Sequence, residues 1–416
     1  MKSVIIIGGG PSGFSAAFAA ASRCAQVTIL ECSNTPGRKL LASGGGRCNV
    51  TNTMPPTKMA GLYHCGGGDY SPSRFVRAAL KGFDQKMLRD FLSSYGVQTD
   101  VEQESFVYPK SRRASDVLDA WRNACTDQGV QIQTACAATS PIFDKGIITG
   151  VNTTKGRFSC DALIIATGGR GYSSLGGTGD GYKLARQCGH RIIKPLPALA
   201  PLQIEDRKLT SCAGVSLQGV LLRIPGIGGK PVSFRGDVLI THTGLSGPAA
   251  LNSATVISRL MFETGKPVPI ELSLDPLADD SRWRNRFITW QQQKGNRKLI
   301  SLLTAGIPKS IVLHIFDRLG LSSDLRASDL PKNSRKDLIG VLVRLPLTVS
   351  GTGGFDKSMV TSGGIDLNEI DSRSMRSRLM KNLFFCGEVI DIDGPCGGFN
   401  LHWAFSSGSL AGLSAA

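Results

Sequence analysis

Three glycines near the start of the chain have the spacing of a dinucleotide-binding loop. Gly8, Gly10 and Gly13 form a Gly-x-Gly-x-x-Gly pattern directly after an apolar run. In such a loop the first glycine permits a tight turn, the second lets a pyrophosphate touch the backbone, and the third lets helix and strand pack closely. Glu31 follows where a carboxylate binds the ribose of an adenosine. The pattern predicts FAD or NAD, and the acidic residue disfavours NADP.

A second loop combines glycine with positive charge. Residues 37–49 carry the basic pair Arg38 and Lys39 before a Ser-Gly-Gly-Gly turn and the single Arg47 after it. Backbone N–H groups and cations at such a turn could bind a pyrophosphate or a flavin ring. A surface loop without a ligand is the alternative interpretation.

Two later apolar runs also end in glycine. Residues 162–166 lead into Thr167 and Gly168, where a strand would pass the cofactor or simply turn. Residues 383–386 lead into Gly387 and Glu388, and a helix is predicted after Gly397. The positive end of that helix would stabilise the negative charge of a reduced flavin. An NAD dehydrogenase needs no such element, so this pattern favours FAD.

Several expected absences narrow the chemistry. No second Gly-x-G-x-x-Gly occurs, and residues 177–181 have the wrong spacing. NAD(P)H would therefore visit the flavin transiently as an electron donor instead of occupying its own domain. The loop 43–49 contains no His for covalent attachment, so the FAD should be held non-covalently. We expect no metal site, since no Cys or His cluster has suitable spacing.

The substrate-side candidates are two histidines. His242 follows a predicted strand, and His402 lies one turn into the C-terminal helix. A structural hydrogen bond is the alternative for each. Cys48 and Cys396 lie beside the cofactor loops, where packing is favoured over redox catalysis. No side chain stands out as a catalytic acid or base.

The elements that must position these residues form a βαβ unit. Residues 3–7 and 27–30 read as buried strands, and residues 11–22 as the helix between them. Strands that are apolar on both faces are typical of a parallel sheet covered by helices. The predicted fold class is α/β, a Rossmann-like FAD-binding domain of the two-dinucleotide-binding flavoprotein type. It would carry an inserted β-barrel-like domain that itself holds a helical insert.

Shifts in composition suggest the domain boundaries. The FAD-binding domain would comprise residues 1–190 and 361–416, the barrel-like domain residues 191–275 and 341–360, and the helical insert residues 276–340. Short apolar runs broken by Gly and Pro indicate the barrel. Apolar residues at helical spacing between charges indicate the insert.

The composition indicates the general class of protein and its expected location. The 416 residues are 41% hydrophobic and 19% charged, which is typical of a globular protein. No apolar run reaches 18 residues and no signal peptide is evident, so we expect no membrane partner and a cytoplasmic location. The number of cysteines, eleven, is odd, which is consistent with reduced thiols.

Two hypotheses for function remain, and the second is suggested by the formal charge of +16. The first is an FAD-dependent oxidoreductase that moves a hydride between a small organic substrate and flavin N5, with NAD(P)H or O2 as the other redox partner. The alternative is a non-catalytic or accessory flavin-bound protein that acts with RNA. Nucleic acid is disfavoured because the basic residues are dispersed. The sequence does not indicate the substrate or the oligomeric state.

The motifs together resemble a bacterial flavoprotein family whose members are labelled NAD(P)/FAD-dependent oxidoreductase, aminoacetone oxidase or 3-dehydro-bile-acid Δ4,6-reductase-like. The resemblance spans nearly the whole chain and rests on GGGPSG at 8–13, GRKLLASGGGRCNVTN at 37–52, THTGLSGP at 241–248 and CGEVIDIDGPCGGFNLHWAFSSG at 386–408. One difference is His402, which stands where many members carry Gln.

The resemblance implies a set of FAD contacts that come from both ends of the chain. These are Gly8, Gly10, Gly13, Glu31, Arg38, Lys39, Ser43, Gly44, Gly45, Asn49, Asp180, Gly387, Glu388, Gly398, Asn400 and Leu401. The motifs add further candidate contacts: Ser12, Arg47, Thr167, Gly168, Gly179 and Gly397.

Overall fold

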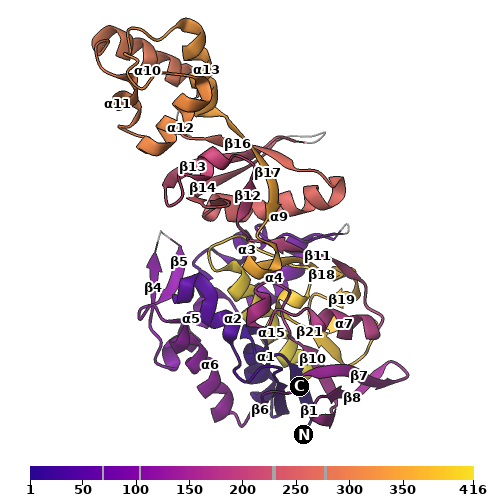
Figure 1. The fold of residues 1–416 in the computed structure, drawn as a ribbon. Coiled ribbons are helices and arrows are strands. Elements are labelled where there is room, and N and C mark those ends of the chain that lie inside the picture. The colour runs from indigo at the N-terminus through magenta and orange to yellow at the C-terminus, as the bar shows by residue number, and fades with distance from the viewer. Residues whose placement is uncertain (68–69, 103–104, 227–230, 276–278) are drawn as a thin grey trace. The chain divides into compact units, whose positions relative to one another are not determined.

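The computed structural model describes residues 1–67, 70–102, 105–226, 231–275 and 279–416 (Figure 1). The chain divides into two compact units. Unit 1 consists of Met1–Pro197 and Ser358–Ala416, and unit 2 consists of Ala198–Lys357. Unit 1 is therefore built from both ends of the polypeptide, and each unit has its own apolar core.

The core of unit 1 is a seven-stranded sheet with the order β19-β20-β21-β10-β1-β2-β6. Five strands are parallel: β1 (Ser3–Ile7), β2 (Gln26–Leu30), β6 (Gln131–Gln133), β10 (Ala162–Ile165) and β21 (Leu383–Phe385). The short strands β19 (Ile370–Asp371) and β20 (Arg376–Ser377) add an antiparallel edge. The central strands are buried on both faces, as their continuous Ile, Val and Leu content predicts.

The first and last long helices of unit 1 lie against each other. They are α1 (Pro11–Ala21) and α15 (Phe399–Ala415), and small residues let them approach closely. A Cβ atom on Gly408 would lie 2.4 Å from the carbonyl oxygen of Ser12, and one on Gly412 would lie 2.2 Å from that of Ala16. Figure 1 places both chain termini in unit 1, near β1.

The remaining helices of unit 1 come mostly from its N-terminal part. They are α2 (Arg38–Ala42), α3 (Pro56–Ala60), α4 (Pro72–Gly82), α5 (Gln85–Ser94), α6 (Ala114–Asp127) and α7 (Asp180–Gln187). Aromatic packing joins α6 to α15, since Trp121 is stacked on Phe405 with ring centroids 5.0 Å apart. In this way the C-terminal helix is held by two helices from the first third of the chain.

Three smaller sheets complete unit 1. One contains β3 (Thr51–Asn52), β5 (Phe106–Pro109) and β4 (Thr99–Glu102), and another contains β7 (Ala138–Asp144), β8 (Ile147–Thr153) and β9 (Gly156–Ser159). The third joins β11 (Ile192–Ala198) to β18 (Val360–Ile365). We expected β11 in the barrel, and the structure pairs it elsewhere. A Cβ on Gly363 would lie 2.4 Å from Lys194 O, so glycine permits this pairing.

Unit 2 is a closed six-stranded barrel with a helical insert. The barrel order is β12-β15-β14-β13-β16-β17. Its strands are β12 (Leu202–Ile204), β13 (Ser216–Ile224), β14 (Val232–Thr241), β15 (Gly244–Ser246), β16 (Val268–Ser273) and β17 (Leu345–Thr352). The helix α9 (Pro248–Thr264) follows β15, and short helices α8 (Arg207–Thr210) and α14 (Gly354–Lys357) occupy connections.

The helical insert lies between β16 and β17 in sequence. It consists of α10 (Asp280–Gln293), α11 (Leu299–Leu303), α12 (Lys309–Leu319) and α13 (Lys332–Val343). The predicted start of this insert, at residues 276–278, lies outside the described residues. In the part of the chain that the structure describes, no helix has both the length and the apolar character needed to cross a bilayer.

Candidate functional site

The first glycine loop has two glycines that the fold requires and one that it does not. Gly8 has a φ of +109°, and a Cβ there would lie 2.6 Å from Ala166 O. A Cβ on Gly13 would lie 1.9 Å from Gly8 O, which closes the turn between β1 and α1. A Cβ on Gly10 would meet nothing within 4 Å. The open side of the loop at Gly10 is where a ligand could touch the backbone.

The start of α1 leaves donors available beside this loop. Gly10 is the residue that caps α1, and no side chain caps the helix. Uncapped backbone N–H groups and the helix dipole favour an anion at such a point. Ser12, a predicted cofactor residue, is buried at the base of this turn.

Glu31 is held beside the glycine loop at the end of β2. Its Oε2 accepts a hydrogen bond from Gly9 N at 2.8 Å. Its Oε1 accepts from Ser33 N at 2.8 Å and from Ser33 Oγ at 2.7 Å. These donors fix the carboxylate in one orientation, and a carboxylate can accept further hydrogen bonds, such as those from ribose hydroxyls.

The second glycine loop is a run of left-handed residues after α2. Gly44, Gly45 and Gly46 have φ values of +57°, +65° and +87°, which other residues rarely adopt. A Cβ on Gly45 would meet nothing within 4 Å. Ser43, which precedes them, donates its hydroxyl to Leu40 O at 2.6 Å. Turns of this kind present N–H groups in a concave arrangement that can hold an anion.

The basic side chains around this loop contact protein groups. Arg38 donates to Ser174 O at 2.8 Å. The Arg47 guanidinium lies over the Tyr108 ring, 5.2 Å from its centroid. Lys39 Nζ pairs with Glu388 Oε2 at 2.9 Å, and their side chains are 24% and 19% exposed. The Lys39–Glu388 pair connects the N-terminal loop to the C-terminal part of the predicted site.

The end of β21 packs on the start of α1. Gly387 has a φ of +75°, and a Cβ there would lie 2.6 Å from Ser12 Oγ. Its N–H donates to Ser407 Oγ at 2.9 Å, and its carbonyl accepts from Trp403 Nε1 at 3.2 Å. Glu388 Oε1 also accepts from the N–H of Thr361 at 3.0 Å. The predicted residues at both chain ends are thus brought together.

The start of α15 is built from glycine held against β3. Gly398 has a φ of +88° and caps α15, and no side chain caps this helix. A Cβ on Gly398 would lie 2.4 Å from Thr51 O, and one on Gly397 would lie 2.8 Å from Phe106 Cε1. Leu401 is half-buried in the first turn of the helix. The start of α15 therefore resembles that of α1, with a glycine at the cap position and no side-chain cap.

Two predicted asparagines hold this backbone in place. The Asn49 amide, oriented with its oxygen toward Gly398, accepts from Gly398 N at 3.2 Å and donates to Thr51 O at 2.9 Å. Asn400 Oδ1 accepts from Gly394 N at 2.8 Å, and its Nδ2 donates to Gly394 O at 2.7 Å. Both side chains order the loops that shape the site.

The strand end after β10 contributes one open glycine. Gly168 has a φ of +69°, and a Cβ there would meet nothing within 4 Å. A Cβ on Gly181 would lie 1.9 Å from Thr167 Oγ1, so Thr167 packs on the first turn of α7. Gly179 is left-handed and caps α7. Asp180 pairs with Lys183 at 2.8 Å, and that hydrogen bond lowers the pKa of Asp180.

The two histidine candidates have very different environments. His402 is fully buried, and its Nδ1 lies 3.0 Å from Thr51 Oγ1. Burial lowers the pKa of His402 to about 4, so the imidazole is neutral at pH 7. A side chain enclosed in this way is out of reach of a substrate in this conformation. His242 is exposed, in the turn between β14 and β15 of unit 2.

The cysteines beside the cofactor loops are protonated at neutral pH. Burial raises the pKa of Cys48 to about 12 and that of Cys396 to about 11. The thiolate is the nucleophilic and redox-active form of cysteine. These thiols are therefore packing groups.

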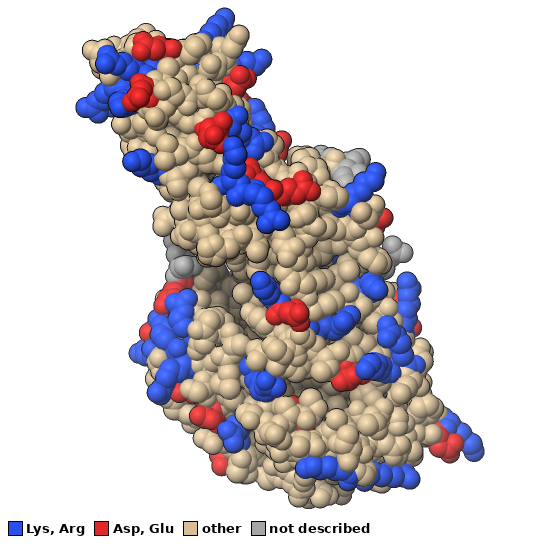
Figure 2. All heavy atoms as spheres, viewed as in Figure 1, with Lys and Arg blue, Asp and Glu red and all other residues tan. Residues whose placement is uncertain are grey.

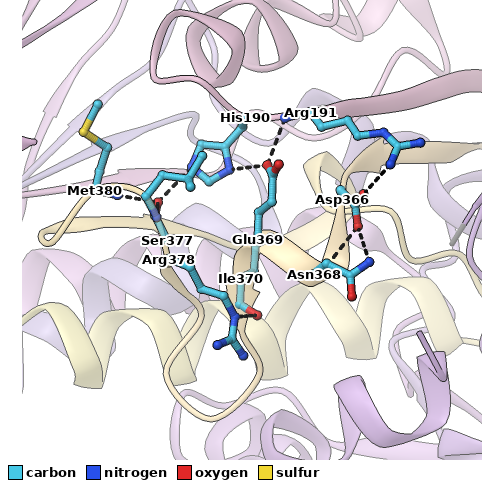
Figure 3. Close-up of polar contacts among 10 residues, drawn as sticks. His190, Arg191, Asp366, Asn368, Glu369, Ile370, Ser377, Arg378 and Met380 are labelled. Carbon is cyan, nitrogen blue, oxygen red and sulfur yellow. Dashed lines mark hydrogen bonds and ion pairs between the residues drawn. The ribbon is translucent and has the colours of Figure 1, made fainter. Parts of the chain in front are cut away.

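The structure also assembles a buried Ser–His–Glu cluster that the sequence analysis did not single out (Figure 3). His190 Nδ1 lies 3.0 Å from Glu369 Oε2, and His190 Nε2 lies 2.8 Å from Ser377 Oγ. Ser377 Oγ already accepts from the N–H groups of Leu379 and Met380 at 3.0 and 2.9 Å. The hydroxyl proton is therefore available to His190 Nε2, which leaves Nδ1–H to donate to Glu369.

The hydrogen bonds follow the same order as in the Ser–His–Asp triad of hydrolases, but here all access to the serine is closed by burial. The His190 side chain is 0% exposed, and Ser377 is also buried. Burial lowers the pKa of His190, although Glu369 acts in the opposite direction. No substrate can reach the hydroxyl, so the cluster ties the end of α7 to the β19–β20 edge. No motif spacing predicts the cluster, because His190 is 179 residues from Glu369 and 187 residues from Ser377 in the sequence.

The site as a whole fits a dinucleotide. Gly10, Gly45 and Gly168 each have open space where a Cβ would stand. The helices α1 and α15, from opposite ends of the chain, both begin at a glycine and have no side-chain cap. A ligand with a central pyrophosphate and a flat ring suits backbone N–H donors and surfaces free of side chains.

Comparisons with known proteins agree with this arrangement. A family model described as HI0933-like protein Rossmann domain matches residues 2–414. The chain is 33% identical to a 3-dehydro-bile acid delta(4,6)-reductase of Clostridium scindens, covering 100% of this chain and 99% of the relative. It is 30% identical to a ribosomal RNA dihydrouridine synthase of Escherichia coli, covering 97% and 95%.

Solved structures share the fold at low sequence identity. A 3-ketosteroid delta1-dehydrogenase from Sterolibacterium denitrificans superposes with a TM-score of 0.52 at 14% identity, covering 99% of both chains. A quinol–fumarate reductase with menaquinol gives a TM-score of 0.50 at 16% identity, covering 100% of this chain and 71% of that one.

The fold is therefore that of a Rossmann-type FAD-binding protein with an inserted barrel, and the predicted fold class is confirmed. Within this class, the chain belongs to the HI0933-like family. The resemblance found in the sequence motifs is confirmed as well.

Proposed function

We propose that this protein is an FAD-dependent oxidoreductase. One observation carries the proposal: Gly387, from the C-terminal part of the chain, packs on Ser12 at the start of α1, where Gly10 leaves an open backbone surface. FAD bound there non-covalently would carry a hydride at N5 between NAD(P)H and a small organic substrate, or to O2. The family and the fold support the cofactor.

The residues of the chain would divide the work of binding. The loop at Gly10 and the start of α1 would bind the pyrophosphate, and Glu31 would accept hydrogen bonds from the adenosine ribose. The left-handed turn at Gly44 and Gly45 and the start of α15 would approach the ring system. The Lys39–Glu388 pair would close the site between the two chain ends.

The direction of the reaction would be reduction of a carbon–carbon double bond conjugated to a carbonyl. The names of the two relatives from Clostridium scindens and Escherichia coli denote saturation of double bonds, in a 3-dehydro-bile acid and in uridine. Such a step adds a hydride to one alkene carbon and a proton to the other, and it oxidises NAD(P)H to NAD(P)⁺. The substrate class that follows is an enone or a uracil ring.

RNA is the second candidate substrate, and one observation favours it. Residues 279–344, the helical insert, contain thirteen Lys or Arg and six Asp, with no Glu. Against it, Figure 2 shows Lys and Arg side chains spread over both units and interleaved with Asp and Glu. A dispersed charge of this kind supports a small-molecule substrate at least as well.

Anaerobic reduction of flavin-loaded protein tests the proposal. We expect NADH or NADPH to bleach the oxidised flavin spectrum, and a steroid enone or a uridine-containing RNA to restore it without O2. Restoration by only one of the two identifies the substrate class. Protein that takes up no FAD, or a reduced flavin that reacts with O2 alone, would contradict the proposed reductase.

A further inference from the structure

Unit 2 contains a cavity whose lining residues all belong to the barrel and its helical insert. Its volume is about 720 Å³, within the range of sites that hold small organic ligands. The barrel lines it with residues of β13, β14 and the end of β16, and the insert lines it with α10, α11 and the turn after α11. We propose that this cavity binds a nucleotide, with the base on Trp290 and the phosphate at Arg235 and Arg286.

The helix α10 presents an aromatic wall to the cavity. Trp283, Arg286 and Trp290 occupy positions i, i+3 and i+7, which lie on one face of a helix. Trp290 packs edge-on against Phe287 at 5.3 Å and against Trp283 at 6.3 Å between ring centroids. These contacts fix the indole, and its partial burial leaves surface for a planar ring to stack on.

The polar lining has an excess of positive charge. Arg286 lies over the Trp283 ring at 4.5 Å and donates to Asp275 Oδ2 at 3.0 Å, so its guanidinium is held in place. Arg235 is exposed and has no ion-pair partner among the described residues. Two guanidinium groups against one carboxylate favour an anion, and the planar fork of arginine suits phosphate.

A nucleotide matches both features of the lining. Its planar base suits the half-exposed indole of Trp290, and its phosphate suits the two guanidinium groups.

Nucleotides of this kind come from two sources, a free dinucleotide such as NADPH or a single strand of RNA. Isothermal titration calorimetry of flavin-loaded protein with NADP⁺, which cannot reduce the flavin, with 5′-AMP and with a 12-nucleotide RNA separates them. We expect NADP⁺ or the RNA to bind, and Trp290→Ala to weaken that binding at least about tenfold, as the loss of a base stack does. Trp290→Phe should retain most of the affinity.

The arginines are tested through their salt dependence. Arg235→Gln and Arg286→Gln should each weaken binding and reduce the slope of affinity against salt concentration, because each phosphate contact releases counterions. The matched control is Arg284→Gln, on the same helix and exposed, but outside the cavity lining. It should change the affinity less than about twofold, as expected for a charge without a phosphate contact.

The result that overturns the proposal is a folded protein that binds none of the three probes, or binding that Trp290→Ala leaves unchanged. The second result would place the nucleotide on unit 1. The proposal for the cavity and the proposal for the flavin site can be tested independently. A Gly10→Val variant, in which the flavin loop is blocked, should still bind the probe in unit 2. Failure to take up FAD with intact Trp290-dependent binding would contradict the proposed function alone.

Discussion

The two units offer ligands opposite kinds of surface. In unit 1, the candidate site consists of glycine backbone and uncapped helix starts, with side chains such as Asn49 and Asn400 turned to holding the loops. In unit 2, the cavity is lined by Trp and Arg side chains. In the first case several of the glycines that shape the site, such as Gly8, Gly13 and Gly398, are also required by the fold. In the second, side chains can be replaced while the barrel and the insert keep their cores.

The largest expected effect is on the glycine that belongs to both fold and site. In Gly13→Ala the new Cβ would lie 1.9 Å from Gly8 O, a backbone atom that cannot move without opening the β1–α1 turn. We expect the free energy of unfolding to drop by about 3–5 kcal/mol, measured by urea denaturation. The same measurement on Trp290→Ala should give a smaller loss. Equal losses of unfolding free energy in Gly13→Ala and Trp290→Ala would contradict the proposed difference between the two units.

The second effect depends on pH and concerns His402. Its pKa is lowered by burial to about 4 from an ordinary value of 6.5. Between these values the unfolded chain binds a proton that the folded chain does not, so stability falls as the pH drops from 6.5 to 4. The loss should approach about 3 kcal/mol at pH 4, and His402→Gln should lack this component.

Urea denaturation at several pH values between 7 and 4 measures the difference. His190 and His314, whose pKa values burial also lowers, contribute in the same direction to both proteins and cancel. Parallel pH profiles for the wild type and His402→Gln would show that His402 is not held neutral by burial.

The third prediction distinguishes FAD binding from the stability of unit 1. Gly10 has an extended backbone, with φ −91° and ψ −175°, that valine can adopt, and its Cβ position is open. Gly10→Val should lower the stability of the flavin-free protein by only about 1 kcal/mol, the usual cost of a poorer residue at a helix N-cap. It should raise the dissociation constant for FAD at least about 100-fold, or about 2.8 kcal/mol. Unchanged affinity in a flavin titration would show that no ligand touches Gly10.

The smallest effects compare one ion pair from each unit. Lys39–Glu388 is mostly buried, at 2.9 Å, whereas Arg344–Asp280 is more exposed, at 2.9 Å, with side chains 41% and 45% accessible. Double-mutant cycles should give coupling of about 1–2 kcal/mol for the first pair and about 0.2–1 kcal/mol for the second. High salt should weaken only the second. A reversed order would contradict the difference in solvation.

Much of unit 1 was predictable because its determinants are local. An apolar run, a glycine triplet and an Ala-rich segment specify β1, the turn and α1 with no knowledge of the rest of the chain. The C-terminal glycines likewise predicted a helix, and α15 extends to Ala415, where its small residues pack along α1. These patterns indicate the local backbone conformation. A glycine in such a pattern indicates a tight turn or a close backbone contact from its residue type alone.

The partners of each element were decided only by the tertiary structure. The pairing of β11 with β18 and the meeting of His190 with Glu369 and Ser377 join residues more than 160 positions apart. The cavity of unit 2 likewise needs Arg235 from a strand and Trp290 from a later helix. Such contacts depend on which apolar faces pack together, a property of the whole core, so no local spacing could reveal them.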